Sequence, residues 1–142
     1  MIVVDAPLLI YAHSQELPQY QAAERWFADA LQDTETVGLP WASLLAFLRI
    51  ITDRRVFRRP FTMREASDAV STWLSFPAAL PLYPTDRHWT ILRRMLEHGQ
   101  VTPRLVNDAH VAALALEHGA TLYTTDRDFA RFPDVRFVNP LA

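Results

Sequence analysis

Three aspartates stand where a folded chain could bring their carboxylates together. Asp5 and Asp126 each directly follow a short predicted strand, and Asp108 opens a predicted helix over residues 107–118. In an open parallel sheet, ligands gather at the carboxyl ends of the strands, and a carboxylate in the first turn of a helix is favoured by unpaired backbone amides. We therefore expect Asp5, Asp108 and Asp126 to meet at one edge of a sheet.

Clustered carboxylates raise each other's pKa unless a cation lies among them. Mg²⁺ and Mn²⁺ are the hard cations that prefer such oxygen ligands. Either ion lowers the pKa of bound water and stabilises charge developing on a phosphodiester, which is the chemistry of a metal-dependent nuclease. Taken singly, each aspartate also fits a helix cap or a turn. Asp128 and Asp134 are assigned to that second role, with Asp128 also a candidate accessory acid.

The strands and helices that must position these residues can be predicted from apolar periodicity and capping patterns. Thr62 and Glu65 form a capping box at the start of one helix, and Gly99 and Gly119 are expected to end two others in the left-handed conformation. Alternating strands and helices indicate an α/β fold, a central parallel sheet of about five strands flanked by helices, in a single domain over residues 1–142. The predicted strands are 2–4, 36–39, 82–83, 121–125 and 135–138, and the predicted helices are 7–12, 18–31, 41–52, 62–76, 86–98 and 107–118.

Residue usage excludes several kinds of chemistry. All 14 basic residues are arginines, so mechanisms that need a lysine, such as P-loops and Schiff bases, are excluded. The absence of cysteine excludes thiol nucleophiles, disulfides and cysteine-based zinc sites. A net charge of −2 neither marks nor excludes a nucleic-acid binder. No apolar run approaches the ~20 residues of a membrane helix and no signal peptide is evident, so we expect a cytoplasmic protein without a membrane partner.

Three blocks resemble the acidic motifs of VapC-like PIN domains, in the same order along nearly the whole chain. The first block resembles the opening of those domains, where an acidic ligand follows the first strand. The second and third resemble two later acidic motifs, each carrying one aspartate. The blocks are VVDAPLLIYA at residues 3–12, LVNDAHVAALA at residues 105–115 and ATLYTTDRDF at residues 120–129.

The resemblance implies a three-layer PIN fold and a magnesium-dependent endoribonuclease, the toxin of a toxin–antitoxin pair. It also implies an RNA substrate, a VapB-type antitoxin as partner and a homodimer. Carried onto this chain, Asp5, Asp108 and Asp126 would hold Mg²⁺ or Mn²⁺ and position the attacking water. Asn107 and Thr125 would be neighbours that orient the ligands.

One position departs from the family pattern. The block WASLLAFLRI at residues 41–50 resembles the family's second acidic motif, but Ala46 stands where that motif carries a glutamate. Alanine keeps the helix while removing the carboxylate. Three hypotheses account for it: an engineered substitution that silences a toxic nuclease, a naturally weakened homologue, or compensation by another acid such as Glu16 or Asp128.

Two functions other than RNA cleavage are compatible with a cluster of aspartates at a sheet edge. A PIN domain lacking one acid can bind RNA and antitoxin without cutting, and an RNA-cleavage assay beside an Ala46→Glu variant separates that alternative from a nuclease. A signalling receiver domain also gathers aspartates at a sheet edge. It resembles this chain less, because such domains need an adjacent acid pair early and a lysine late, and this sequence has neither.

The densest positive cluster lies within residues 54–59. Its arginines can contact RNA phosphates or the acidic groups of an antitoxin, or form a solvated face. The histidines show no metal-site spacing, and Trp26, Trp73 and Trp89 follow helical apolar patterns that predict core or dimer-interface positions. The arginines of the cluster are Arg54, Arg55, Arg58 and Arg59.

Overall fold

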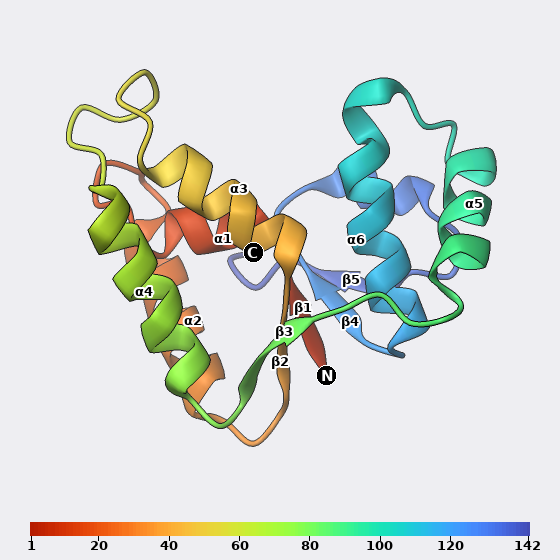
Figure 1. The fold of residues 1–142 in the computed structure, drawn as a ribbon, viewed down its shortest axis with the longest axis horizontal. Coiled ribbons are helices and arrows are strands. Elements are labelled where there is room, and N and C mark those ends of the chain that lie inside the picture. The colour runs from red at the N-terminus through yellow and green to blue at the C-terminus, as the bar shows by residue number, and fades with distance from the viewer.

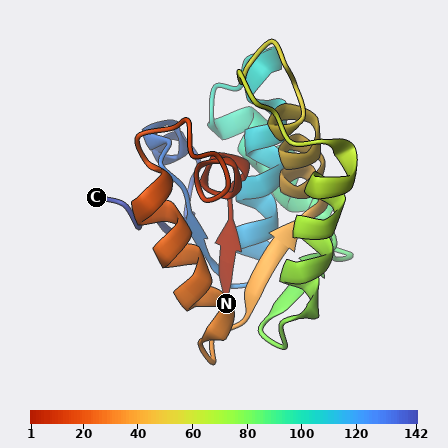
Figure 2. The same cartoon turned by 90° about the vertical axis from the view of Figure 1, so that its left-hand side faces the viewer.

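A computed structural model describes all residues from 1 to 142 and contains one five-stranded sheet. The strand order is β3-β2-β1-β4-β5, and every neighbouring pair is parallel, as Figure 2 shows for β1 and β2. The predicted α/β architecture is therefore confirmed. The strands are β1 (Ile2–Val4), β2 (Val37–Pro40), β3 (Ala79–Leu82), β4 (Thr121–Tyr123) and β5 (Phe137–Val138).

Six α-helices cover the two faces of this sheet. Figure 1 shows the first four on one side of the strands and the last two on the other, with α5 packed outside α6. No helix has the length and apolar character needed to cross a membrane. The helices are α1 (Ala6–Tyr11), α2 (Tyr20–Gln32), α3 (Trp41–Ile51), α4 (Met63–Ser75), α5 (His88–His98) and α6 (Val106–Glu117), with short 3₁₀ helices η1 (Pro103–Leu105) and η2 (Arg127–Arg131).

The alternation of side chains along β1 explains why the sheet is buried on both faces. Ile2 and Val4 pack in the larger hydrophobic cluster, with residues of α1 to α4. Val3 points the other way and packs with α6 and with Leu122 of β4. All three β1 residues are buried, as the short all-apolar run predicts. The end of β1 is therefore fixed from both sides.

Local signals located several element ends, and one expected helix cap is wrong. Thr62 and Glu65 form the predicted capping box, and Gly119 adopts the predicted left-handed conformation with φ of +64°. Gly99 does not, because its φ is −85° and the positive φ falls on Gln100. Glycine is needed at position 99 for space, since a Cβ there would lie 2.7 Å from the backbone oxygen of Met95.

Two further expectations need correction. The third strand begins at Ala79 rather than Leu82, and it includes Pro81, which an edge strand tolerates because one side of its backbone has no strand partner. Trp89 is not in the core of this chain, since 63% of it is exposed, so only its predicted place in a dimer interface is left; Trp73 is buried and Trp26 stacks on Tyr123.

His13 lies inside an aromatic cluster of the core. Its ring contacts Trp73 and Phe47, with ring centroids 4.8 and 5.4 Å away. Nδ1 lies 2.8 Å from the backbone oxygen of Leu9, and Nε2 lies 3.2 Å from the indole nitrogen of Trp73, which donates to it. Both contacts are satisfied by a neutral ring with its hydrogen on Nδ1. Burial lowers the pKa of His13, although the Leu9 bond and the charge of Glu24 act in the opposite direction.

We expect this histidine to make the fold sensitive to acid. A lowered pKa means that the folded state binds fewer protons than the unfolded state, so the stability from His13 is complete above about pH 6.5 and is lost as the pH falls below it. A His13→Asn variant keeps a donor for Leu9 but takes up no proton. Chemical denaturation between pH 7.5 and 5 should therefore show the wild type losing more stability than the variant, and parallel curves would contradict this assignment.

Candidate active site

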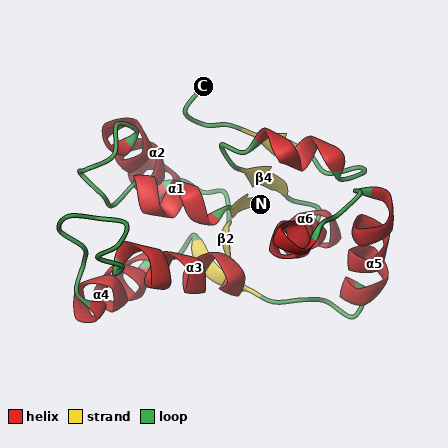
Figure 3. Cartoon of the chain, turned by 90° about the horizontal axis from the view of Figure 1, so that it is seen from above, coloured by secondary structure: helices red, strands yellow, loops and turns green.

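A cavity of about 150 Å³ lies at the carboxyl ends of β1 and β4, between α3 and α6. Figure 3 looks down on this end of the sheet and shows the two helices on either side of the strands. Asp5, Asp108 and Asp126 all line the cavity, as the sequence predicts. Its other lining residues are Ala6, Pro7, Ala42, Ser43, Ala46, Asn107 and Val111.

Asp5 is the most buried of the three carboxylates, with only 6% of the residue exposed. It caps α1, because Oδ1 accepts a 3.0 Å hydrogen bond from the backbone amide of Ala6. Oδ2 accepts a 2.8 Å hydrogen bond from the hydroxyl of Thr124. Burial raises the pKa of Asp5 to about 6, with the two hydrogen bonds opposing the shift and the charges of Asp108 and Asp126 adding to it.

Thr124 is a site residue that the sequence reasoning missed. Its buried hydroxyl donates to Asp5 and accepts a 3.0 Å hydrogen bond from the backbone amide of Asp126, so it joins the ends of β1 and β4. The predicted orienting residue was its neighbour Thr125, for which the structure shows no hydrogen bond to either aspartate. Alternation along the strand was the available signal, because it places Thr124 on the opposite side from Tyr123.

Asp108 and Asp126 bring the other two carboxylates to the cavity. Asp108 is the third residue of α6 and is partly buried. Burial raises its pKa, and the charges of Asp126 and Asp128 raise it further against the opposing effects of Arg104 and Arg131. Asp126 caps η2 by accepting the backbone amide of Asp128 at 2.8 Å. Asp126 therefore fills both roles predicted for it: it caps a helix, and it lines the shared cavity.

The wall opposite α6 comes from the first turns of α3. Ser43 fixes this helix to the end of β1, since its hydroxyl donates to the backbone oxygen of Val4 at 2.9 Å. Ala42 and Ala46 lie one helical turn apart and both line the cavity. A longer side chain at position 46 would therefore reach the same space as the three carboxylates.

The donor set suits a hard divalent cation, because every charged group in the cavity offers carboxylate oxygens. Asp5 and Asp108 have raised pKa values partly because negatively charged carboxylates lie near one another there. A bound cation would relieve this electrostatic repulsion. No three histidine, aspartate or glutamate side chains are arranged so that they could already hold a metal ion.

Comparisons with known proteins agree with this geometry. The PIN-domain family model matches residues 2–135. The ribonuclease VapC37 of Mycobacterium tuberculosis is 42% identical over 142 residues, which cover 100% of this chain and 99% of that protein. The VapC ribonuclease Mb2897 of Mycobacterium bovis is 38% identical, over 99% of this chain and 96% of that protein. The chain belongs to the VapC family of PIN domains.

A solved structure shows the same fold at much lower identity. The VapC-family chain resembles a chain of VapBC2 from Rickettsia felis, solved bound to a promoter DNA fragment, with a TM-score of 0.70 and 15% identity over 98% of both chains. The PIN fold expected from the motifs is therefore confirmed.

Of the other predicted site residues of this VapC-family domain, only some line the cavity. Asn107 lines the cavity beside Asp108. Asp128 does not line it, but its charge acts on Asp108. Glu16 cannot compensate for Ala46, because its carboxylate accepts the backbone amides of Arg58 and Arg59, each at 2.9 Å, away from the carboxylate cavity.

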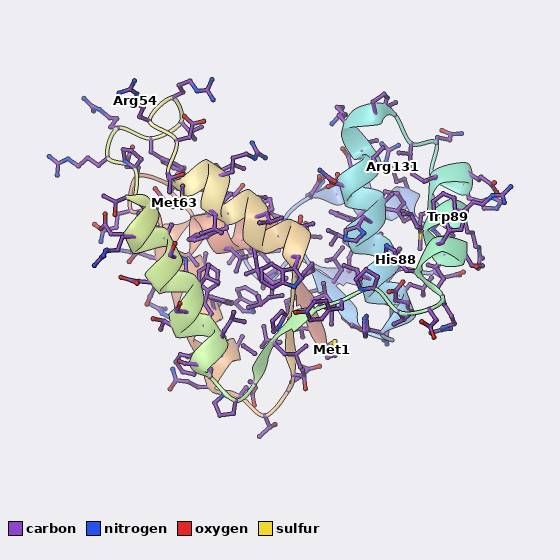
Figure 4. All side chains as sticks on the ribbon, viewed as in Figure 1. Met1, Arg54, Met63, His88, Trp89 and Arg131 are labelled. Atoms are coloured by element: carbon purple, nitrogen blue, oxygen red, sulfur yellow. The ribbon has the colours of Figure 1, made fainter.

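The four clustered arginines of the VapC-family chain lie in the loop between α3 and α4, which we call the arginine loop, with Arg54 at its exposed tip (Figure 4). Arg55 pairs with Asp53 at 3.2 Å, whereas Arg54, Arg58 and Arg59 have no ion pair. A second cavity, of about 620 Å³, lies beside this loop and contains none of the three site aspartates. The loop is thus a positive surface separate from the acidic cavity.

Proposed function

We propose that this protein is an endoribonuclease toxin that cuts RNA by metal-assisted hydrolysis. The observation that carries the proposal is that Asp5, Asp108 and Asp126 line one cavity in a VapC-family PIN domain. Relatives named as VapC ribonucleases, 35–42% identical over nearly their whole length, support the reaction class. The proposed substrate is therefore an RNA phosphodiester.

In this proposal the three carboxylates hold Mg²⁺ or Mn²⁺. The bound ion would lower the pKa of water and stabilise charge on the phosphodiester. Asp5 is held in place by Thr124 and by the Ala6 amide, so it forms the rigid side of the site. Asp108 and Asp126 face it from α6 and from the end of β4, and Asn107 can contact the substrate at the cavity rim.

Ala46 is proposed to weaken this particular chain. Since position 46 lines the cavity, a glutamate there would complete the acidic site that the family resemblance implies. Asp128 is the remaining candidate for compensation, because its charge acts on Asp108. A non-cleaving PIN domain that binds RNA and antitoxin is the alternative that this position favours.

A direct assay separates cutting from binding. We expect slow cleavage of a mixed-sequence RNA in Mg²⁺ or Mn²⁺, stopped by EDTA and restored by excess metal. Cleavage that persists in EDTA would contradict the metal mechanism. Retention of RNA without cleavage, at saturating metal and protein, would favour the non-cleaving alternative.

We also propose a VapB-type antitoxin as partner and a homodimer as the assembled state. Support for the antitoxin comes from the similarity to a chain solved as part of a VapBC complex and from the VapC relatives, whereas the homodimer rests on the family resemblance alone. The cognate antitoxin would occupy a surface of this domain, and removing it would release the ribonuclease.

The arginine loop is proposed to contact RNA phosphates. Glu16 holds the loop backbone by accepting the amides of Arg58 and Arg59, so the side chains extend from a fixed support. Removing an arginine that touches a phosphate should weaken RNA binding and reduce its salt dependence. We expect an R54A/R58A/R59A variant to bind RNA about tenfold more weakly at low salt, with a shallower slope of log Kd against log salt.

The matched control is Arg93→Ala, which removes an exposed arginine of α5 that pairs with Glu97. It should leave both the affinity and the salt slope near wild type. If the triple variant keeps the wild-type slope, the loop does not contact RNA, and contact with the antitoxin or a solvated face remain as the alternatives.

A further inference from the structure

Glu117 is a buried acid that takes no part in the carboxylate cavity. It ends α6, and its side chain is fully buried. Oε1 accepts a 2.8 Å hydrogen bond from the backbone amide of Thr85, and Oε2 lies 2.7 Å from Nδ1 of His88. A buried carboxylate is costly unless it is hydrogen-bonded, and here both oxygens have partners.

The contacts of His88 extend from Glu117 to a second histidine. Its Nε2 lies 2.9 Å from Nδ1 of His110, which belongs to α6. The carboxylate fixes the hydrogen of His88 on Nδ1, so a neutral His88 offers Nε2 as an acceptor for the Nδ1 hydrogen of His110. Figure 4 shows His88 at the start of α5, on the side facing α6. Glu117, His88 and His110 therefore form one continuous hydrogen-bonded chain, which we call the Glu–His–His chain.

This chain reaches the part of α6 that carries a site aspartate. His110 follows Asp108 by two residues and directly precedes Val111, which lines the cavity. None of the three members of the chain lines the cavity itself. Any influence on the site must therefore pass through the position of the helix.

The start of α6 is packed into the core but lacks a capping side chain. Its N-cap residue, Leu105, makes no side-chain capping bond, and the helix continues directly from the 3₁₀ helix η1. Much of its buried surface is alanine, and such small side chains offer few interlocking contacts against sliding or rotation. A directional hydrogen bond adds a constraint on sliding and rotation to this packing. The buried alanines are Ala109, Ala112, Ala113 and Ala115.

We propose that the Glu–His–His chain is a positioning device for the proposed active site. It holds the first turns of α6 against α5 and so sets Asp108 opposite Asp5 in the cavity. The inference rests on the proposed function for its link to metal binding, whereas its effect on the helix is independent of that function. Glu117, His88 and His110 are positioning residues, since they act through Asp108.

The test breaks the bond between the histidines from each side. His88→Asn keeps a donor at the place of Nδ1 for Glu117 but no longer reaches His110, and His110→Ala removes the same bond from the α6 side. His110→Asn keeps a polar atom at the place of Nδ1 and should preserve the bond. His118→Ala is the matched control, because Nε2 of His118 lies 2.9 Å from the backbone oxygen of Tyr83 and ties the other end of α6 to the same loop.

Two readouts are taken on each full-length variant: the Kd for Mn²⁺ by electron paramagnetic resonance, and amide hydrogen exchange over residues 105–112. We expect His88→Asn and His110→Ala to exchange faster there and to bind Mn²⁺ about tenfold more weakly. His110→Asn and His118→Ala should match the wild type in both. A merely structural role would lower the melting temperature without moving the Mn²⁺ Kd of the folded protein.

Three results would overturn the proposal that the Glu–His–His chain positions Asp108. Wild-type exchange over residues 105–112 in His88→Asn and His110→Ala overturns the proposal, as does a loss in His110→Asn equal to that in His110→Ala. Faster exchange with an unchanged Mn²⁺ Kd also overturns it, because the helix would then move without affecting the site. If the wild type binds no Mn²⁺, the metal proposal fails separately, and the exchange data alone show whether the chain positions α6.

Discussion

Replacing Ala46 with glutamate is expected to raise Mg²⁺-dependent RNA cleavage by at least about a hundredfold. Position 46 lines the cavity that also holds Asp5, Asp108 and Asp126, so the new carboxylate enters the same small space. It should have a second effect, because another negative charge among groups that already raise each other's pKa destabilises the metal-free protein. The melting temperature of the variant should fall in EDTA and recover in Mg²⁺.

Leu45→Glu is the matched control for this experiment. It adds the same side chain to the adjacent position of α3, but Leu45 is 59% exposed and does not line the cavity. Cleavage and metal-dependent melting should stay at the wild-type level in this control. If Ala46→Glu gains no cleavage, the hypothesis of a silenced active site is rejected, and the non-cleaving alternative becomes the better description.

Asp5→Asn is expected to have two opposite consequences. In the Ala46→Glu background, it should reduce cleavage by at least about a hundredfold, because the most buried of the carboxylates is removed. In the metal-free protein it should increase stability at pH 7.5 by about 3 kcal/mol. That value follows from the rise of the Asp5 pKa from 3.8 to about 6, at about 1.4 kcal/mol per unit.

The sign of the stability effect can be checked by pH. A raised pKa means that folding favours the protonated acid, so the contribution of Asp5 is complete below about pH 4 and is lost as the pH rises through about 6. The advantage of Asp5→Asn should therefore shrink as the pH falls from 7.5 to 4. Asp68→Asn, at an exposed position of α4, should show no such trend. An Asp5→Asn variant that is less stable than the wild type at pH 7.5 would contradict the burial-driven pKa.

Much of the fold could be predicted because its signals are local. The run Ile2–Val4 lies in the middle of the sheet and is apolar on both faces, and the capping box at Thr62 fixes the start of α4 through contacts three residues apart. The error at Gly99 has a tertiary cause. Its space is limited by the Met95 carbonyl one turn earlier and by the ring of Phe132, and no local pattern reports a neighbour from a segment as distant as Phe132.

The candidate site shows the same difference between local signals and contacts that join distant segments. The aspartates were found because each follows a strand or lies in the first turn of a helix, and parallel strands end at a common edge. The strand before Asp126 is shorter than predicted, since β4 ends at Tyr123. Thr124 was missed because its role depends on a hydrogen bond to Asp5, which is 119 residues away in sequence. The Glu–His–His chain was missed for the same reason, since its bonds cross 29 and 22 residues between α5 and α6.

The central claim is that three carboxylates at one sheet edge share a divalent cation, and anomalous scattering from crystals soaked in Mn²⁺ tests it most directly. The proposed site predicts one strong peak in the cavity, about 2.0–2.3 Å from carboxylate oxygens of Asp5 and of Asp108 or Asp126. The peak should be stronger in Ala46→Glu and absent in Asp5→Asn. A cavity without Mn²⁺ at saturating concentration in both the wild type and Ala46→Glu, or a peak held by other residues, would contradict the claim.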